Sequence, residues 1–412
     1  MATGRNKGPI FVHASQRSGS TYFFNVLRRM DSLICFDEAI NDYFGHYGKE
    51  HFVRRKSHRS WNWSHNFLDR YSQTELVEAW DEVMNLYPPA PAFRDYVPAT
   101  GVLAGELRRY LGALIDYAAA REKRAAFCEI YSRGRAAALK DAFGGFHIAQ
   151  YRDPLSQFGS AFRALQEFGA WTFLIIPLQE LGLRNENPLY SIVPREWRVP
   201  ALPWPANDRA QRWASTEEYV ALILSSDQHA LERVFRWHLL SWILNNLAAV
   251  AYSDFALDID KAYDDLDYRQ SVREVLRREV ETNADFSNLT KFSRYYRFED
   301  FDICSVTTEV VAVIKKTQEN GELDAAVASL AKGRPTLSSG EAVRLLCAKI
   351  DAALAGWVST DKPTRVTRAD WSELVRKHRH IWANPRLRTL MQKMYPLALP
   401  MVQAARNTGL MR

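Results

Sequence analysis

Small and hydroxylated residues near the N-terminus form a segment that could bind phosphate. It follows the apolar run Pro9–Ala14, which is typical of a strand covered on both faces, and it precedes a segment of helical periodicity. The segment contains Gln16, Arg17, Ser18, Gly19, Ser20 and Thr21. A loop of this kind directs several backbone N–H groups and the positive end of the helix toward one point. We therefore expect an anion site here, with the guanidinium of Arg17 adding positive charge.

The segment differs from the phosphate-binding loop of ATPases and GTPases. That loop requires G-x-x-x-x-G-K-[ST], whereas here Gly19 is followed by Ser20 and the position five residues earlier is Ala14. The basic residue instead precedes the glycine, in the order R-S-G-S-T. The sequence therefore argues against hydrolysis of ATP or GTP by this loop.

A second polar turn follows the apolar segment Phe146–Tyr151. It consists of Arg152, Asp153 and Pro154, and Ser160 lies eight positions after the arginine. As local structure alone, the aspartate would cap a helix and the proline would occupy its first position. Eight residues of straight helix would place Arg152 and Ser160 ~12 Å apart.

Together the two segments resemble the donor-binding signature of sulfotransferases that use 3′-phosphoadenosine-5′-phosphosulfate (PAPS). The first is similar to the family's 5′-phosphosulfate loop, in which [KR]-S-G-[ST]-[ST] follows a strand and precedes an aromatic residue. The second is similar to the family's 3′-phosphate site, in which a strand ends in R-D-P and a serine follows eight residues later. The resemblance implies that Arg152 and Ser160 share one phosphate, which requires the turn to bend back or the arginine to reach. The resemblance covers residues 1–165, with a looser match over 225–280. It implies a P-loop NTPase-like three-layer sandwich, PAPS as donor and no metal.

The resemblance also implies two anion pockets, one at the N-terminal end of each of two helices, which hold opposite ends of one nucleotide. Sulfuryl transfer requires mainly that the protein position the reactants and stabilise charge on the transferred group. Arg17 is the residue that we expect to stabilise this charge. The acceptor hydroxyl or amine must also lose a proton to a base.

Glu38 is the first candidate for that base. It follows the apolar segment Leu33–Phe36, and a residue at the carboxyl end of a strand beside the phosphate loop faces the same crevice. Many carbohydrate sulfotransferases carry a comparable glutamate in E-P-x-N, which Glu38 and Asn41 match and Ala39 does not. Glu38 could instead belong to a surface loop. His13 is the second candidate, although a histidine within a strand is more often packed and hydrogen-bonded.

Two later segments differ from the family pattern. Where the family commonly has a lysine near the sulfuryl group, this chain has Arg133, which either replaces that lysine as a substrate-binding residue or is a solvated residue at a helix start. Glu129, four residues earlier, is a further carboxylate of undetermined role. The family's downstream strand has two possible counterparts, one with Asp258 and Asp260 and the other at Tyr296–Asp300, and the sequence does not decide between them.

The acceptor is expected to bind two segments that are rich in aromatic and basic residues, 42–75 and 169–215. The second carries six prolines between Pro177 and Pro205, so we predict irregular insertions. Trp61 and Trp63 could stack on sugar rings while arginines bind carboxylates or sulfates, which favours a glycan acceptor. The same composition is typical of packing, and a lipid head group or a small hydroxylated metabolite stays open.

The elements that must position these residues alternate along the chain. Apolar segments predict strands at 9–14, 33–36, 125–131, 146–151 and 255–259, and helical periodicity recurs at 23–30, 74–86, 106–120, 135–142, 158–165, 225–250 and within 268–281. This alternation is typical of an α/β fold with a central parallel sheet. Beyond residue 300 the pattern is mostly helical. We therefore assign residues 1–300 to a sulfotransferase-like α/β domain and 301–412 to a helical C-terminal extension.

Composition restricts the class of protein further. The 412 residues are 47% hydrophobic and 25% charged, with a net charge of +6, which fits a globular protein with an anionic ligand. The four cysteines lie far apart without zinc-binding spacing, so we expect reduced thiols. No segment has the length and hydrophobicity of a secretory signal or a membrane span, which predicts a cytoplasmic protein.

Two other functions stay open at this stage. A small-molecule kinase with a P-loop-like fold would also place a phosphate loop after the first strand, and it predicts dependence on ATP and magnesium. A nucleic-acid-binding protein would use the basic stretch Lys49–Arg59 and the neighbouring tryptophans, and its binding would weaken steeply with salt. No nucleic-acid-binding signature accompanies that stretch, so we expect no nucleic-acid partner.

Overall fold

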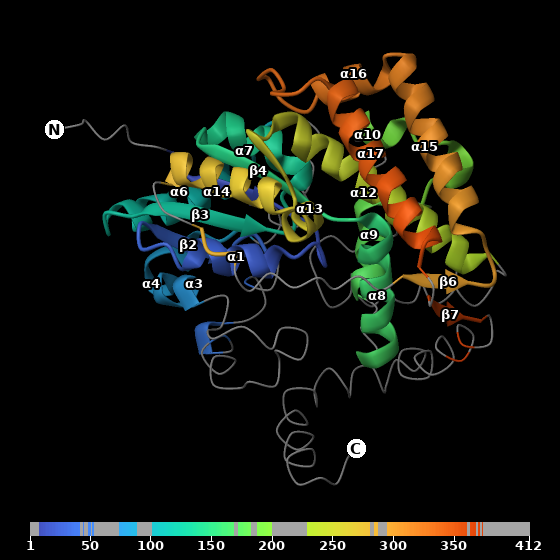
Figure 1. The fold of residues 1–412 in the computed structure, drawn as a ribbon. Helices are drawn as coiled ribbons and strands as arrows, with labels where there is room; N and C mark the ends of the chain where they lie inside the picture. Colours follow the sequence, from blue (N-terminus) through green and yellow to red (C-terminus); the bar gives the residue numbers. More distant parts are fainter. Residues whose placement is uncertain are drawn as a thin grey trace, which may run out of the picture.

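A parallel sheet lies at the centre of the computed structural model (Figure 1). The structure describes residues 8–41, 44, 48–50, 52, 74–88, 101–168, 172–182, 188–199, 229–280, 284–286, 295–360, 363–367, 370 and 373. The strands are β1 (Ile10–His13), β2 (Leu33–Asp37), β3 (Arg124–Glu129), β4 (Phe146–Tyr151) and β5 (Phe255–Asp258). Their order is β2-β3-β1-β4-β5, and every pair is parallel. The predicted α/β class with a central parallel sheet is therefore confirmed.

The connections of the sheet diverge between β1 and β4. After β1 the chain runs to β2 at one edge, and after β4 it runs to β5 at the opposite edge. β1 and β4 are neighbours, with Ile10 opposite Phe146 and His13 opposite Ala149. Ligands of open α/β sheets bind where two such connections diverge, beyond the carboxyl ends of the strands. Both polar turns identified in the sequence follow these two strands.

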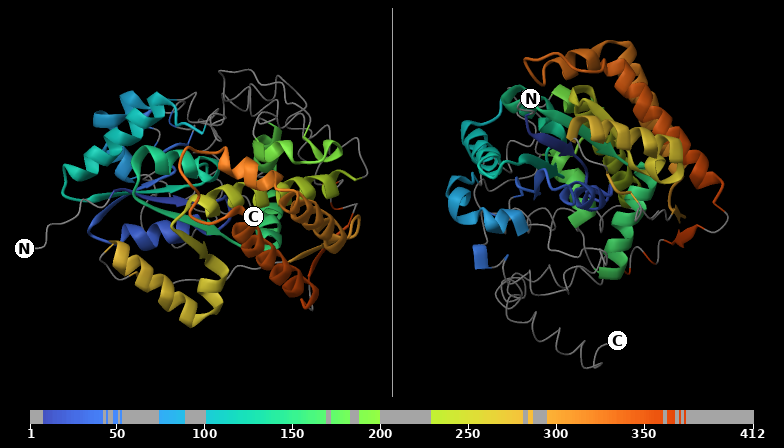
Figure 2. Two further views of the ribbon diagram at one scale, coloured as in Figure 1. Left: turned by 90° about the horizontal axis from the view of Figure 1, so that it is seen from above. Right: turned by 60° about the vertical axis from the view of Figure 1, so that its left-hand side comes forward.

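Helices cover both faces of the sheet, which makes three layers (Figure 2, left). On one face α1 (Ser20–Arg28), α13 (Ile259–Asp264) and α14 (Leu266–Val280) pack against Ile10 and Val12. On the other face α3 (Thr74–Glu78), α6 (Gly105–Ala119) and α7 (Ala136–Phe143) pack against Phe11 and Phe127. Because both faces are covered, the strands are continuous apolar runs rather than alternating ones.

A second, helical core lies beside β4 and β5. It contains α8 (Pro154–Phe168), α9 (Thr172–Gly182), α10 (Pro188–Ser191), α12 (Ala230–Tyr252), α15 (Ile303–Glu319), α16 (Glu322–Ala328) and α17 (Ser339–Val358). Nearly every side chain of α12 is buried, because α9, α15, α17 and the sheet surround it. β6 (Tyr296–Phe298) and β7 (Thr364–Val366) form a small parallel sheet at its edge. The helices after residue 300 therefore share one apolar core with α8, α9 and α12.

Some predicted elements differ from the structure. The helical segment 74–86 is divided into α3, α4 (Trp80–Val83) and the 3-10 turn η3 (Met84–Leu86). The predicted irregular insertion 169–215 is wrong for residues 172–182, which form the regular helix α9 with Pro177 inside it. Leu174 and Leu178 of α9 are buried in the helical core, and this packing outweighs the local cost of a proline. A further 3-10 turn, η5 (Arg195–Trp197), follows α10.

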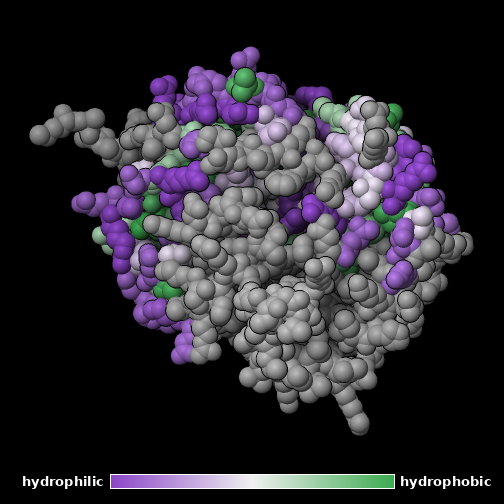
Figure 3. Space-filling model, turned by 60° about the horizontal axis from the view of Figure 1, so that its bottom comes forward, coloured by the Kyte–Doolittle hydropathy of each residue, from purple (hydrophilic) through white to green (hydrophobic). Residues whose placement is uncertain are grey.

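The surface of the described residues is mainly polar. Seen from below, it is largely hydrophilic, with small separate apolar patches (Figure 3). The large apolar side chains that are exposed within the described ranges, Leu86, Val102, Leu266 and Val358, belong to different segments. None of the helices among these residues combines the length and apolar character that crossing a membrane requires.

Candidate functional site

The loop between β1 and α1 is held by hydrogen bonds from the neighbouring strand and helix. The Ser18 hydroxyl donates to the Ser15 carbonyl at 2.6 Å, and Gln150 Nε2 from β4 donates to the Ser18 carbonyl at 2.9 Å. Gln157 Nε2 from α8 donates to the Gln16 carbonyl at 2.6 Å. These bonds give the carbonyl groups of Ser15, Ser18 and Gln16 a partner. The loop is therefore fixed before any ligand binds.

The backbone of the loop leaves the start of α1 uncapped. Gly19 has φ +84° and precedes the first residue of the helix, so no side chain caps the first N–H groups. Arg17 also has a left-handed φ, +62°, which is unusual for a residue with a side chain. Uncapped N–H groups and the helix dipole attract anions. The helix start that follows this loop is therefore uncapped at the place where the sequence predicts an anion site.

Arg17 connects the two predicted phosphate sites. Its Nε donates to the hydroxyl of Ser160 at 2.9 Å, and Arg152 Nη1 donates to the Arg17 carbonyl at 3.2 Å. The guanidinium of Arg17 also lies 5.1 Å from the centre of the Phe173 ring. Ser160 and Arg152 thus each contact Arg17, from opposite ends of the residue. The ~12 Å helical separation of Ser160 from Arg152 is bridged by a residue of the first loop.

Positive charge accumulates around Arg17. Burial, together with the smaller effect of the charges of Arg152 and Arg163, lowers the pKa of Arg17 to about 10. Among the described residues no carboxylate lies within ion-pair distance of Arg17. A bound anion would therefore stabilise the charge of Arg17, which is partly buried near two other guanidinium groups. This arrangement is the strongest electrostatic sign of a ligand site in the described part of the chain.

The second turn caps its own helix, so one sequence expectation needs correction. Asp153 Oδ1 accepts from the N–H groups of Leu155 and Ser156 at 2.8 and 3.1 Å, and α8 begins at Pro154. The predicted structural role of Asp153 and Pro154 is therefore confirmed. The expectation of an anion pocket at the N-terminus of this helix is wrong, because the aspartate already occupies it. An anion here would contact the side chains of Arg152 and Ser160.

A network of ionic groups supports Arg152. Arg152 Nε lies 3.4 Å from Asp260 Oδ1, and Asp260 Oδ2 accepts from the Asp153 N–H at 2.7 Å. Lys349 Nζ from α17 lies 2.9 Å from Asp260 and 2.7 Å from Asp258. Burial raises the pKa of Asp260, but Lys349 and Arg152 outweigh it and hold the pKa below its usual value.

The two downstream segments belong to different sheets. Asp258 ends β5 of the main sheet, whereas Tyr296–Phe298 form a strand of the separate small sheet. Lys349 was not a sequence candidate. Nothing local marks it, since it is one lysine within a helix that lies about two hundred residues beyond Arg152 in the chain.

Glu38 lies directly after β2, as predicted. Its backbone is left-handed, with φ +50°, and its N–H donates to the Cys128 carbonyl at 2.9 Å. Its Oε2 accepts from Asn41 Nδ2 at 2.5 Å. The two residues that match the E-x-x-N pattern are therefore hydrogen-bonded to each other. This bond orients the carboxylate and keeps it partly accessible.

The side chain of Glu129 accepts a hydrogen bond from the turn that follows β2. It is fully buried, and its Oε2 accepts from the Ile40 N–H at 3.3 Å. Burial raises the pKa of Glu129 well above its usual range, and the nearby carboxylates of Glu38 and Asp37 raise it further. Glu129 is thereby favoured in its neutral form, which makes it a structural partner of the Glu38 turn.

His13 is packed and hydrogen-bonded, as expected of a histidine within a strand. Its Nδ1 lies 2.7 Å from the Ser132 hydroxyl and its Nε2 lies 2.9 Å from His147 Nδ1. Burial lowers the pKa of His13 well below its usual value, and the neighbouring His147 adds to this effect. Both ring nitrogens are engaged in the core, so the geometry favours Glu38 over His13 as a base.

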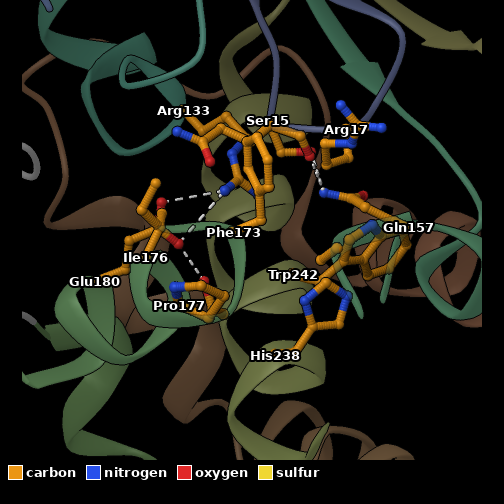
Figure 4. Close-up of a pocket in the computed structure, with 13 residues that line it drawn as sticks. Ser15, Arg17, Arg133, Gln157, Phe173, Ile176, Pro177, Glu180, His238 and Trp242 are labelled. Carbon is orange, nitrogen blue, oxygen red and sulfur yellow. Dashed lines mark hydrogen bonds and ion pairs between the residues drawn. The ribbon is translucent and has the colours of Figure 1, made fainter. Parts of the chain in front are cut away.

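Arg133 is buried, and its alternative assignment as a solvated residue is wrong. Its Nη2 lies 3.3 and 3.4 Å from the two carboxylate oxygens of Glu180 on α9. The pair lines a cavity beside the loop (Figure 4). The cavity was not foreseen, because three of its walls come from α8, α9 and α12. Trp61, Trp63 and most of the segment 42–75 lie outside the described residues.

Comparison of the chain with models of protein families, with curated proteins and with solved structures finds no match. Among the described residues, no three His, Cys, Asp or Glu side chains are grouped so that they could hold a metal ion. The four cysteines are free thiols.

Proposed function

We propose that this protein transfers a sulfuryl group from PAPS to an acceptor hydroxyl or amine, with a glycan or glycoconjugate as the expected acceptor. The observation that carries the proposal is the convergence of Arg17, Arg152 and Ser160 where the β1 and β4 connections diverge. A nucleotide with phosphate groups at both ends of its ribose would neutralise this cluster. The order of the sheet and the loop after β1 are compatible with a P-loop-like fold.

The two ends of the donor would bind different parts of the cluster. The N–H groups of Ser20 and Thr21 at the start of α1, together with Ser18 and Gly19, would hold the 5′-phosphosulfate. Arg152 and Ser160 would hold the 3′-phosphate, and Asp260 and Lys349 would fix the position of Arg152. Gln16, whose amide donates to the Tyr131 hydroxyl at 3.0 Å, forms the wall of the loop. Arg17 would lie between the two anionic groups.

The proposed reaction is an in-line displacement at sulfur. The acceptor oxygen or nitrogen forms a bond to sulfur, and the bond from sulfur to the bridging phosphate oxygen breaks with its electron pair. The products are the sulfated acceptor and adenosine 3′,5′-bisphosphate. The carboxylate of Glu38 takes the acceptor proton, and Arg17 stabilises negative charge on the leaving phosphate.

Calorimetric titration with adenosine 3′,5′-bisphosphate tests the donor site. We expect tight binding in the full chain and in Glu38→Gln, and a loss of roughly 10²-fold or more in Arg17→Ala and in Arg152→Ala, because each removes a charged hydrogen-bond donor. Arg29→Ala is the matched control, since this arginine lies exposed at the other end of α1.

The same titration separates the rival kinase function. A kinase would bind ATP with magnesium in preference to the bisphosphate, and a chelator would abolish its turnover. Equal binding of the bisphosphate by the wild type and Arg152→Ala would remove the basis of the proposal. Steep weakening of binding to single-stranded or duplex nucleic acid with salt would point instead to a nucleic-acid-binding protein.

A further inference from the structure

Several buried polar atoms of residues that line the cavity beside the loop have no hydrogen-bond partner. They are Arg133 Nε and Nη1, Gln16 Oε1, Gln157 Oε1 and His238 Nδ1, and all four residues line the cavity. Arg133, Gln157 and His238 are 4%, 6% and 5% exposed. Buried polar groups are normally satisfied, and leaving one without a partner costs free energy. Their convergence on one cavity therefore indicates a ligand.

The positive charge of Arg133 is balanced within the cavity, whereas that of Arg17, which also lines it, is neutralised only when the proposed donor binds. Arg133 is paired with Glu180, whose Oε2 also accepts from Asn245 Nδ2 at 2.7 Å and from the Ser241 hydroxyl. Figure 4 shows Arg133 and Glu180 together on one side of the cavity, and Gln157, Trp242 and His238 on the other. A ligand with a net charge would meet an ion pair that is already neutral. A neutral ligand is therefore favoured.

The orientation of two side chains decides which hydrogen bonds the cavity offers. Gln157 Nε2 donates to a main-chain carbonyl and to the Ser15 hydroxyl, so its unpartnered Oε1 is the acceptor that this side chain can offer. His238 Nε2 lies 3.1 Å from the Pro154 carbonyl and must carry the proton. Burial lowers the pKa of His238 to about 4, so at neutral pH its Nδ1 is an acceptor. The cavity thus combines guanidinium donors with at least two acceptors.

A hydroxyl group complements this set. Its oxygen accepts from Arg133, and its proton is donated to Gln157 Oε1 or His238 Nδ1. A carboxylate would place its oxygens against these two acceptors, and an ammonium group would be repelled by Arg133. The volume open to the centres of water molecules is about 20 Å³, which admits the end of a ligand and not a whole sugar ring.

We propose that this cavity, whose lining includes Phe173 and Trp242, binds the hydroxyl end of a neutral alcohol through Arg133, Gln157 and His238. The loop residues Ser15, Gln16 and Arg17 form one wall of the cavity. The bound hydroxyl therefore lies beside the proposed donor site. The binding site itself rests on the cavity alone, whereas its use as the acceptor site rests on the proposed function.

Three fluorinated probes of nearly equal size test the chemistry of the site. They are 2-fluoroethanol, fluoroacetate and 2-fluoroethylamine, which carry a hydroxyl, a carboxylate and an ammonium group on the same CH2F reporter. We expect the full chain to broaden the fluorine resonance of 2-fluoroethanol in a saturable manner that ethylene glycol reverses. The other two probes should bind at least roughly tenfold more weakly, because each leaves buried groups unsatisfied.

Variants assign the binding to this cavity. Arg133→Met removes the guanidinium donors and keeps an aliphatic side chain. His238→Phe removes the imidazole acceptor and keeps an aromatic ring. Each variant should weaken the binding of 2-fluoroethanol roughly tenfold. His229→Phe makes the same change at the exposed start of α12 and should have no effect. Circular dichroism and thermal unfolding of each variant confirm that it is folded. Because Arg133→Met leaves Glu180 unpaired, the double variant Arg133→Met/Glu180→Met is measured beside it.

Two outcomes would overturn the inference. Preferential binding of fluoroacetate that is lost in Arg133→Met would make the cavity an anion site. Binding of none of the probes, with ordered water bridging Arg133 and Gln157 in a crystal structure, would make it a site for structural water only. Titration with adenosine 3′,5′-bisphosphate is independent of both outcomes, so a failure of the donor site and a failure of the alcohol site can be told apart.

Discussion

At the scale of single residues, the candidate site combines uncommon backbone geometry with chemically active side chains. Arg17, Gly19 and Glu38 all have positive φ values, and all three belong to the two turns that follow β1 and β2. Such conformations cost of order 1–3 kcal/mol for residues with a side chain and persist where the surrounding structure enforces them. Here the hydrogen bonds from Gln150, Gln157 and the β3 backbone enforce them.

The role of Glu38 can be tested at this scale. We predict that Glu38→Gln lowers turnover with PAPS by ~10²–10⁴-fold, the contribution of a positioned base, and leaves the affinity for adenosine 3′,5′-bisphosphate unchanged. Glu122→Gln is the control, because Glu122 is an exposed glutamate that also has a left-handed backbone, with φ +55°. Wild-type turnover in Glu38→Gln would assign the proton to another group and leave the donor site untouched.

At the scale of elements, α17 reaches the site from the far end of the chain. Lys349 is the residue through which it does so, and its side chain is 12% exposed beside Asp258 and Asp260 at 14% and 15%. Burial lowers the pKa of Lys349, but the two carboxylates outweigh it and hold the pKa above its usual value. Lys349 acts on a ligand only through Asp260 and Arg152, so it is a positioning residue.

The affinities for two nucleotides show whether Lys349 positions Arg152 or only stabilises the fold. We predict that Lys349→Met weakens the binding of adenosine 3′,5′-bisphosphate roughly tenfold, because Asp260 then attracts Arg152 away from the 3′-phosphate. Adenosine 5′-monophosphate lacks that phosphate, and its affinity should stay the same. Lys315→Met, on the exposed face of α15, should change neither. Equal weakening of both nucleotides would show that Lys349 only stabilises the fold.

At the scale of the whole molecule, histidines buried in neutral form connect stability to pH. Burial lowers the pKa values of His147 and His238 to about 4, whereas an unfolded histidine titrates near 6.5. The folded chain therefore binds fewer protons than the unfolded chain. This contribution to stability is fully present above pH 6.5 and is lost as the pH falls toward 4.

Urea unfolding at pH 7.5 and pH 5 measures this effect. Each of the two histidines should contribute about 2 kcal/mol to the decrease in the free energy of unfolding between these pH values, given its shift. In His238→Phe the decrease should be smaller by about that amount, and in the exposed variant His229→Phe it should match the wild type. The same decrease in His238→Phe and in the wild type would contradict the pKa shift.

Local sequence determined the elements and the positions of the two loops. Strand ends at His13, Asp37 and Tyr151 follow from apolar runs that stop at polar turns, and the cap formed by Asp153 and Pro154 depends only on adjacent residues. The anion-binding loop could be predicted because glycine, hydroxyl groups and a following helix are enough to build it.

Only the tertiary structure decided which of these residues meet. The hydrogen bond from Arg17 to Ser160 joins residues 143 positions apart in the chain. Arg133 pairs with Glu180 on a helix that the sequence does not predict, and Lys349, which contacts Asp260, belongs to α17. These contacts depend on how α8, α9, α12 and α17 pack around one apolar core. Periodicity fixes the buried face of each helix, but the identity of its partner is set by the packing of the whole chain.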